Sequence, residues 1–382
     1  MGRNSVEIYF QYLNLTLGQF YSALAYYWDH KSSIDEEIQT RIGKINDLRP
    51  KFENMGISLS AVTTRCSGMH MEDYPKTLIE LEPRFSTEEA CRDYLFQPRW
   101  PCGFRCPACG HDRAWTRRDG LFECKKCGYK ASIRAGTIFE GSRKPLVLWF
   151  RAVWWITSQK NGASALGLKR ILGFGSYETA WTWLHKLRRA MVRPRRDRLG
   201  GTIQVDETYI GGEKSGKRGR GAEGKALVLI AAEEDGKGTG RIRLKQIANA
   251  SGDSLQTAVQ ETVELGSIVK TDGWQGYTGL KALGYGHEII RKTANIGENL
   301  LPLCDREASL IKRWLNGTHQ AAVSHEHLAY YLDEYTFRFH RRKSHYRGKL
   351  FYRLLQNAVE VGPIKYHDIV KGVRGLKPKH NM

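Results

Sequence analysis

Two Cys-x-x-Cys pairs constrain the fold of this 382-residue chain more than any other feature of its sequence. Fourteen residues separate the pairs, and a glycine follows each one, as in the tight turn of a zinc knuckle. Four thiolates with this spacing bind Zn²⁺ tetrahedrally between short hairpins, and the zinc is structural because no coordination position stays open. The pattern therefore predicts a zinc ribbon in which Trp115 and Phe122 cover a metal held by Cys106, Cys109, Cys124 and Cys127.

The charge balance points to a polyanionic partner. Sixty Lys and Arg residues stand against 40 Asp and Glu, which gives a net charge of +20 and a pI near 9.6. Nucleic acid is the commonest partner of so basic a chain, with a ribosomal or membrane-surface partner as the alternative. No apolar run reaches the ~20 residues that span a bilayer, and no secretion signal is evident. We therefore expect a cytoplasmic, nucleoid-associated bacterial protein with no membrane partner.

Composition and motifs divide the chain into five segments. The first is either a helical extension or a non-native leader from an upstream start codon, since Met69 and Met71 precede a clean domain start. A helix beginning at Ser86, its expected N-cap, opens the organised part. The predicted segments are an extension (1–70), a helix plus zinc ribbon (71–138), a helical DNA-binding domain with a basic linker (139–198), a mixed α/β catalytic domain (199–360) and a tail (361–382).

Residues 164–192 resemble a helix-turn-helix. Helices are expected at 164–172 and 176–192, joined by a Gly-Phe-Gly turn. In such a motif the start of the second helix enters the DNA major groove, and an ordinary helical hairpin is the alternative. The basic loop after residue 210 and the basic cluster near residue 341 would add contacts to the phosphate backbone of the DNA. The predicted DNA-binding residues are Tyr177, Lys186, Arg218, Arg220, Arg341 and Arg342.

The predicted catalytic domain, 199–360, begins with a strand, 202–210, that carries Asp206. The element order is three strands, a helix, a strand ending at Asp272, a short helix, a strand and a helix at 302–316, which predicts a mixed sheet. In that sheet the first and fourth strands are neighbours, so the two aspartates project side by side. Two carboxylates in one low-dielectric site require a cation, and two divalent ions there would support phosphoryl chemistry. The adjacent Glu207 points to the opposite face by strand alternation.

A third acid is expected on the helix at 302–316. Asp305 shares a polar helical face with Ser309 and Lys312, whereas Glu307 lies within the apolar part of the helix. Periodicity favours Asp305, and Glu307 remains the alternative. Lys312 on the same face as Asp305 suits a lysine that contacts phosphate.

The chain resembles an insertion-sequence transposase of the DDE type, with an N-terminal zinc ribbon and an RNase H-like catalytic domain. The resemblance implies Asp206 and Asp272 as the first two acids, and Lys312 as the lysine after the third. If the chain is aligned with the family on the segment SLIKRW, Asp305 is the third acid. If it is aligned on the sequence distance from Asp272, the third acid is Glu307. The segments that carry the resemblance are YPKTLIELEPRFSTEEAC, RCPACG, CKKCG, LKRILGFGSYETAW, VDETYIGG, TDGWQGY, SLIKRWLNGTH and HLAYYLDEYTFRFHRR.

The resemblance also implies cofactors, partners and chemistry. It implies structural Zn²⁺ in the ribbon and Mg²⁺ or Mn²⁺ held by Asp206, Asp272 and Asp305. It implies cleavage at the element's DNA ends, strand transfer into target DNA, and a homodimer or larger assembly on DNA. The alternatives are a non-catalytic DNA-binding protein, such as a decayed transposase, and a general nuclease. His340 stands where relatives often carry Asn.

Overall fold

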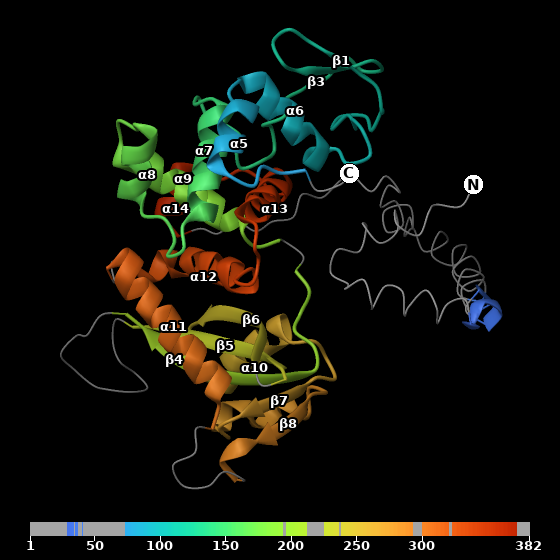
Figure 1. The fold of residues 1–382 in the computed structure, drawn as a ribbon. Coiled ribbons are helices and arrows are strands. Elements are labelled where there is room, and N and C mark those ends of the chain that lie inside the picture. Colours follow the sequence, from blue (N-terminus) through green and yellow to red (C-terminus); the bar gives the residue numbers. More distant parts are fainter. Residues whose placement is uncertain are drawn as a thin grey trace. The chain divides into compact units, whose positions relative to one another are not determined.

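The computed structural model describes residues 29–33, 35–36, 40, 73–193, 196–211, 225–236, 238–292, 300–320 and 323–372. Contacts divide the chain into two units, Met1–Met69 and His70–Met382. The helices predicted for residues 1–70 fall largely outside the described residues, although the few described positions there include helical ones. The second unit holds the elements discussed below (Figure 1). No helix in the described part of the chain is long and apolar enough to cross a membrane.

The second unit begins with two short helices and a small three-stranded antiparallel sheet. Thr87 caps the second helix by accepting a hydrogen bond from the backbone N–H of Ala90, whereas the predicted cap, Ser86, donates to the carbonyl of Pro83. The sheet supports the predicted hairpin strands of the ribbon. The elements are α5 (Leu78–Arg84), α6 (Glu88–Arg99), β1 (Ala114–Thr116), β2 (Phe122–Cys124) and β3 (Lys130–Ala131).

Three helices follow, α7 (Leu146–Ser158), α8 (Ala165–Leu172) and α9 (Tyr177–Ala190). Side-chain caps begin α8 and α9, because the hydroxyls of Ser164 and Ser176 accept hydrogen bonds from backbone N–H groups of the first turns. Gly173 ends α8 at φ 63°, a left-handed conformation that favours glycine. The two predicted helices and the turn between them are therefore confirmed.

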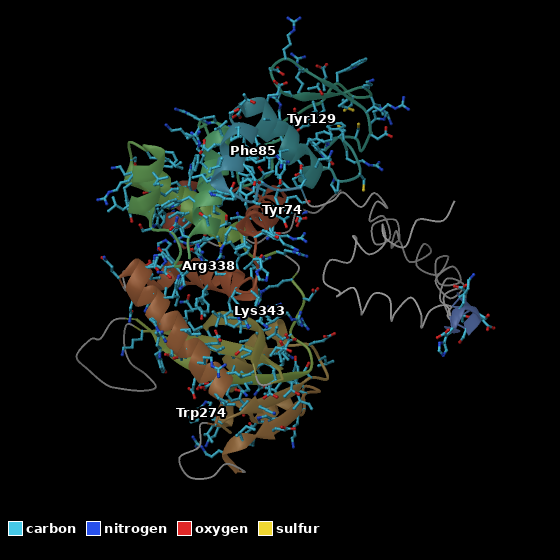
Figure 2. The ribbon with its side chains drawn as sticks, viewed as in Figure 1. Tyr74, Phe85, Tyr129, Trp274, Arg338 and Lys343 are labelled. Carbon is cyan, nitrogen blue, oxygen red and sulfur yellow. The ribbon has the colours of Figure 1, made fainter. Side chains whose placement is uncertain are left out.

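The helical core is completed from the far end of the chain. Helix α13 (Arg347–Glu360) packs against α6, α7 and α9, and its apolar residues join their core. Phe85, labelled in Figure 2, lies in this core with its ring 5.9 Å from that of Phe351 on α13. The predicted catalytic segment, 199–360, therefore contains both α12 (His325–His340) and α13, although α13 packs in the helical core. The predicted tail also contains α14 (Tyr366–Val370).

A five-stranded mixed sheet forms the second core, with strand order β6-β5-β4-β7-β8. Strands β4 to β6 form an antiparallel meander, and β7 and β8 run parallel to β4. This order and these directions are those of an RNase H-like domain, as predicted. The elements are β4 (Thr202–Ile210), β5 (Ala226–Asp235), β6 (Gly238–Ile247), α10 (Gly252–Thr262), β7 (Ile268–Thr271), β8 (Gly286–Ile289) and α11 (Pro302–His319).

Helices cover the two faces of this sheet separately. Alternate residues of β4 and β5 pack with α10 on one face, and the intervening residues pack with α11 and α12 on the other (Figure 1). Period-two alternation in the strands therefore decides which face each side chain reaches. Ser251 caps α10, because its hydroxyl accepts a hydrogen bond from the backbone N–H of Ser254.

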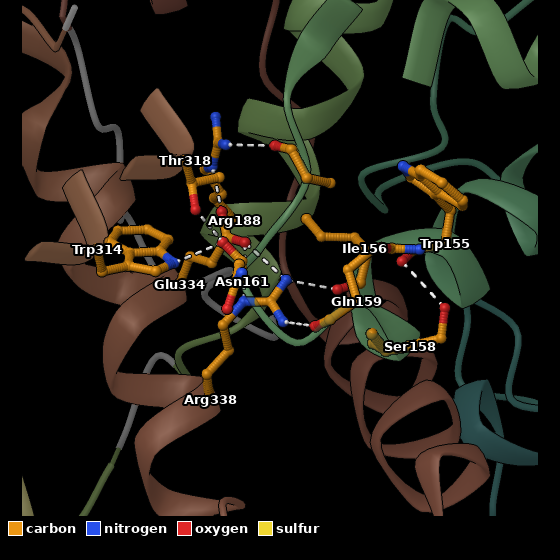
Figure 3. Close-up of polar contacts among 12 residues, drawn as sticks. Trp155, Ile156, Ser158, Gln159, Asn161, Arg188, Trp314, Thr318, Glu334 and Arg338 are labelled. Atoms are coloured by element: carbon orange, nitrogen blue, oxygen red, sulfur yellow. Dashed lines mark hydrogen bonds and ion pairs between the residues drawn. The ribbon is translucent and has the colours of Figure 1, made fainter. Parts of the chain in front are cut away.

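A buried ion cluster joins the helical core to the RNase H-like domain (Figure 3). Glu334 of α12, 0% exposed, accepts hydrogen bonds from Arg188 Nε of α9 at 2.7 Å and from Arg338 Nε at 2.9 Å. Arg338 also donates to the carbonyls of Ile156 and Gln159 at the end of α7. The α9 and α12 elements are thereby held together by charge-assisted hydrogen bonds.

A second contact beside this cluster involves α11. The indole Nε1 of Trp314 donates to the carbonyl of Asn161 at 2.8 Å, and the hydroxyl of Thr318 donates to the same oxygen (Figure 3). Asn161 lies in the α7–α8 connection. The helical core therefore contacts the C-terminal half of the helix whose N-terminal half carries Asp305.

Candidate active site

Asp206 and Asp272 lie at matching positions on neighbouring strands. Strands β4 and β7 run parallel with Gln204 opposite Lys270. Continuing that register by two residues brings Asp272, just past the end of β7, opposite Asp206. The predicted juxtaposition of these two carboxylates at the centre of the sheet thus follows from the observed strand pairing.

Asp206 and its neighbour Glu207 point to opposite faces. Gln204, on the same face as Asp206, accepts a hydrogen bond from the backbone N–H of Leu303 at the start of α11, 3.0 Å away. Glu207 faces the α10 side, where the hydroxyl of Tyr277 donates to its carboxylate at 2.8 Å. Asp206 therefore shares its face of the sheet with α11, as the strand alternation predicted.

Asp305 is on the first turn of α11, near enough to Asp206 for its charge to act on that carboxyl group. Its neighbour Cys304 is buried against β5, with its thiol 3.7 Å from the carbonyl of Ile230. Asp305 itself is exposed, as are Ser309 and Lys312 along the same helical face. A carboxylate in the first turn is favoured by the helix dipole. The predicted polar face of α11 is present in the structure.

Glu307, the alternative third acid, is in a different environment. It is 1% exposed and accepts a hydrogen bond from the hydroxyl of Tyr335 at 3.1 Å. Burial raises the pKa of its carboxyl group. Glu307 is therefore part of the packing between α11 and α12, and Asp305 is the acid of this helix that faces solvent.

The electrostatics of Asp206 reflect its crowded position. Burial, with smaller contributions from the carboxylates of Glu207, Asp272 and Asp305, raises the pKa of Asp206 to about 7. Asp272 accepts a hydrogen bond from the backbone N–H of Trp274 at 2.9 Å. A bound divalent cation such as Mg²⁺ would relieve the repulsion among these acids, and carboxylate oxygens are the ligands that it prefers, but the three carboxylates are not all within 4.8 Å of one another in this structure.

Two residues near these acids escaped the sequence prediction. Arg291 Nη2 lies 3.8 Å from a carboxylate oxygen of Asp272, and Gln204 connects β4 to α11 as described above. Gln204 could have been found by alternation, because it precedes Asp206 by two residues on the same face. Arg291 lies just beyond β8, and no sequence spacing indicates its approach to Asp272.

The four ribbon cysteines form a second candidate metal site. Within the described residues they are the one set of three or more His, Cys, Asp and Glu side chains near enough to share an ion, with ligand atoms within 4.8 Å of one another. The Sγ atoms of Cys106 and Cys127 are 3.6 Å apart, as are those of Cys109 and Cys124. Zn–S bonds of ~2.3 Å in a tetrahedron require sulfur atoms roughly 3.8 Å apart. The cysteines therefore fit a tetrahedral zinc ion.

The aromatic residues predicted to cover this site differ in exposure. Phe122 is 6% exposed and packs beside Trp100. Trp115 is 63% exposed, with Lys125 Nζ 3.7 Å from its ring centroid. The prediction that Trp115 covers the metal is wrong, because the outer strand β1 turns its side chain to solvent.

The predicted DNA-binding residues have unequal exposure. Tyr177, at the start of α9, is 51% exposed, but Lys186 is only 9% exposed. The prediction of Lys186 as a surface contact is wrong, because the C-terminal half of α9 is buried beneath α12 and α13. Arg341 and Arg342 stack on Phe337 and Phe339. The remaining two candidates, Arg218 and Arg220, lie outside the described residues.

Family comparisons agree with the motifs. Residues 198–340 match the family model of the ISXO2-like transposase domain, and residues 86–130 match that of the transposase zinc-ribbon domain. A curated relative is the uncharacterized protein in transposable element ISH50 of Halobacterium salinarum. It is 27% identical over 282 residues, which cover 66% of this chain and 91% of the relative. The resemblance to insertion-sequence transposases of the DDE type with a zinc ribbon is thus confirmed.

Solved structures give weaker similarities. The Mos1 transposase paired-end complex with left transposon end is 13% identical with a TM-score of 0.26, over 61% of this chain and 80% of that one. The simian T-cell lymphotropic virus intasome in complex with PP2A regulatory subunit B56 gamma is 14% identical with a TM-score of 0.24, over 46% of this chain and 64% of that one.

Proposed function

We propose that this chain, which carries the zinc ribbon and the transposase domain of an insertion-sequence transposase, cuts the DNA backbone at the element's ends and joins the freed 3′ ends to target DNA. The observation that carries the proposal is the grouping of Asp206, Asp272 and Asp305 on one face of the sheet. Their mutual repulsion and the raised pKa of Asp206 are typical of a site built for cations and for phosphoryl chemistry.

In this proposal each acid has a role that follows from its position. Asp206 and Asp272 hold Mg²⁺ or Mn²⁺ between two rigid strands, and Asp305 completes the set from the first turn of α11. The bound ions would activate the attacking hydroxyl and stabilise the leaving oxygen. Lys312, two turns further along the exposed face of α11, binds a phosphate of the DNA next to the cut. Glu307 takes no part, because its carboxyl group is buried against Tyr335.

The remaining domains would bind the element's ends. Zn²⁺ held by the four cysteines stabilises a small ribbon that has too little core to fold alone. The α8–α9 pair presents the N-terminal turn of α9, with Tyr177 exposed, to the DNA groove. Because both ends must be held together, we expect at least two copies of the chain on DNA.

The test uses a labelled duplex that contains the inverted repeat found in the DNA flanking the gene. We expect Mg²⁺-dependent nicking at the repeat, followed by joining to a second duplex. Asp206→Asn removes one negative charge from the acidic site and abolishes both reactions while DNA binding persists. Glu207→Gln is the matched control, since its side chain faces α10 and keeps its hydrogen bond to Tyr277.

Other outcomes separate the alternative functions. Full activity of Asp206→Asn would show that the acids are not the reactive site. Specific binding of the repeat by the wild-type chain without cleavage would identify a non-catalytic DNA-binding protein. Cleavage with neither end specificity nor joining would identify a general nuclease.

A further inference from the structure

A pocket of about 240 Å³ opens where the helical core meets the edge of the sheet, and its lining is dominated by arginines. The arginines come from separate parts of the chain: one follows α9, one precedes β4, two are on β6 and one follows α12. They are Arg193, Arg196, Arg241, Arg243 and Arg341. Side chains from such distant segments converge in this way only because the two cores pack together.

The positive charge in this pocket is only partly neutralised by protein. Arg241 forms a bidentate pair with Glu233 beside the pocket, at 2.8 and 3.0 Å, and Asp197 contributes a carboxylate to the lining. Glu360 lies near Arg193 and interacts with it. Within the described residues the carboxylates that interact with these five guanidinium groups are those of Glu233, Asp197, Glu264 and Glu360, which leaves an excess of positive charge.

Two of the arginines, the buried Arg243 and the half-buried Arg341, have no hydrogen bond to a carboxylate within the described residues. Arg243 is 4% exposed and donates to the backbone carbonyls of Ile242 and Asp197. Arg341 donates to the carbonyl of Phe337 and stacks on its ring. In the described part of the chain neither guanidinium has a hydrogen bond to a carboxylate. Burial, followed by repulsion from neighbouring arginines, lowers the pKa of each to about 10.

The uncharged side chain of His340 in the pocket lining is compatible with an anionic ligand. His340 accepts a hydrogen bond from the backbone N–H of Ile242 at 2.9 Å and thereby covers the open edge of β6. Burial lowers the pKa of His340 to about 3, so the imidazole is neutral at physiological pH and adds no charge to the pocket. Guanidinium forks match the geometry of phosphate and carboxylate oxygens and can bind them through two hydrogen bonds.

The size and position of the pocket indicate which phosphate it takes. It is smaller than the ~300–1,000 Å³ of pockets that enclose a drug-sized ligand, so a single phosphate enters while the rest of the molecule stays outside. Arg193 is exposed at its rim, where a polymer could continue across the surface. The pocket also lies between the end of α9 and the transposase domain, both of which are proposed to bind DNA.

We propose that this pocket binds one phosphate of the DNA backbone, with Arg243 and Arg341 at its base and Arg193 at its rim. The proposal rests on the function proposed above, in which DNA is the substrate. The bound phosphate fixes the DNA at the junction of the two cores, so that the segment bound by α9 keeps a constant register relative to Asp206.

The test measures the affinity of the full-length chain for a fluorescent inverted-repeat duplex over a range of salt concentrations. Arg341→Gln and Arg193→Gln each weaken binding about tenfold, as expected for a lost charge-assisted hydrogen bond. Each also lowers the slope of log affinity against log salt by about 0.9 for the lost phosphate contact. Asp197→Asn strengthens binding, because it removes a negative charge from the lining. Lys245→Gln is the matched control, since Lys245 is also on β6 but is paired with Glu261.

Inorganic phosphate at constant ionic strength distinguishes the source of the ligand. If phosphate raises the melting temperature of the wild-type chain while Arg341→Gln and Arg193→Gln bind DNA normally, the pocket takes a free anion and the proposal is overturned. If the wild-type chain cuts DNA and both variants keep the wild-type affinity and salt slope, this proposal alone fails. If the wild-type chain binds no DNA, the proposed function fails with it. Because Arg193 is exposed, its replacement keeps the test valid even if Arg341→Gln unfolds.

Discussion

The buried cluster around Glu334 makes a quantitative prediction about stability. Glu334 is fully buried between Arg188, 2% exposed, and Arg338 (Figure 3). Glu334→Gln leaves two guanidinium groups without their counter-charge in a region from which water is excluded. Removing one partner of a buried ion pair destabilises a protein by about 3–5 kcal/mol. We expect the lower part of that range, because Arg338 keeps its bonds to two α7 carbonyls and Arg188 keeps its bond to Ala163.

Urea unfolding monitored by tryptophan fluorescence measures this loss, since several tryptophans lie in the helical core. A loss of about 3 kcal/mol corresponds to a fall of roughly 5 °C in melting temperature for a unit of this size. Glu261→Gln is the matched control, because its partner Lys245 is on the surface and such pairs contribute about 0–1 kcal/mol. A change below about 1 kcal/mol for Glu334→Gln would refute the view that this cluster holds the two cores together.

The same carboxylate gives the effect a pH dependence. Burial raises the pKa of Glu334, but the charges of Arg338 and Arg188 outweigh burial and hold the pKa at about 2. Its contribution to stability is therefore fully present above about pH 4.5 and is lost as the pH falls towards 2. The difference in unfolding free energy between wild type and Glu334→Gln should shrink over that interval.

Three further predictions concern other parts of the second unit. Cys124→Ser removes one thiolate from the ribbon site, so the purified chain loses its equivalent of zinc by elemental analysis, and retention of zinc would contradict the assignment. Burial lowers the pKa of His319 to about 4 and of His340 to about 3, so unfolded chains bind protons that folded chains do not below pH 6.5. Below pH 6.5 each histidine then lowers the unfolding free energy by about 1.4 kcal/mol for each pH unit. Between pH 6 and about pH 4.5, His340→Asn should halve the pH dependence of the unfolding free energy that these two histidines cause, as measured by urea unfolding. Tyr177→Ala at the exposed start of α9 should weaken binding of the inverted-repeat duplex, whereas Ala substitution of the exposed Tyr366 on α14 should leave binding unchanged.

Features encoded by local spacing were predictable from the sequence. The cysteine pairs, the alternation along β4 and the polar face of α11 each depend on residues close together in the chain, and the structure has all three. The separation of Asp206 from Glu207 followed from strand alternation alone. The burial of Glu307 agrees with its place in the apolar part of α11.

Features that depend on distant segments were not predictable. Lys186 looked like a surface residue because α12 and α13, which bury the end of α9, follow it by more than a hundred residues in the sequence. The Arg188–Glu334 pair spans 146 positions, and the arginine pocket combines residues that precede the sheet in the sequence, belong to it and follow it. Charge composition indicated an anionic partner, but only the packing of the two cores indicates where a phosphate could bind.

We propose that Asp206, Asp272 and Asp305 together cut DNA, and the choice between Asp305 and Glu307 as the third acid gives this proposal its sharpest test. The measurement compares the single-turnover cleavage rates of Asp305→Asn and Glu307→Gln on the inverted-repeat duplex in Mg²⁺. We expect a loss of more than about 100-fold for Asp305→Asn, and nearly wild-type cleavage for Glu307→Gln once its folding is verified. Cleavage that survives in Asp305→Asn but disappears in a folded Glu307→Gln variant would refute the assignment of Asp305 as the third acid.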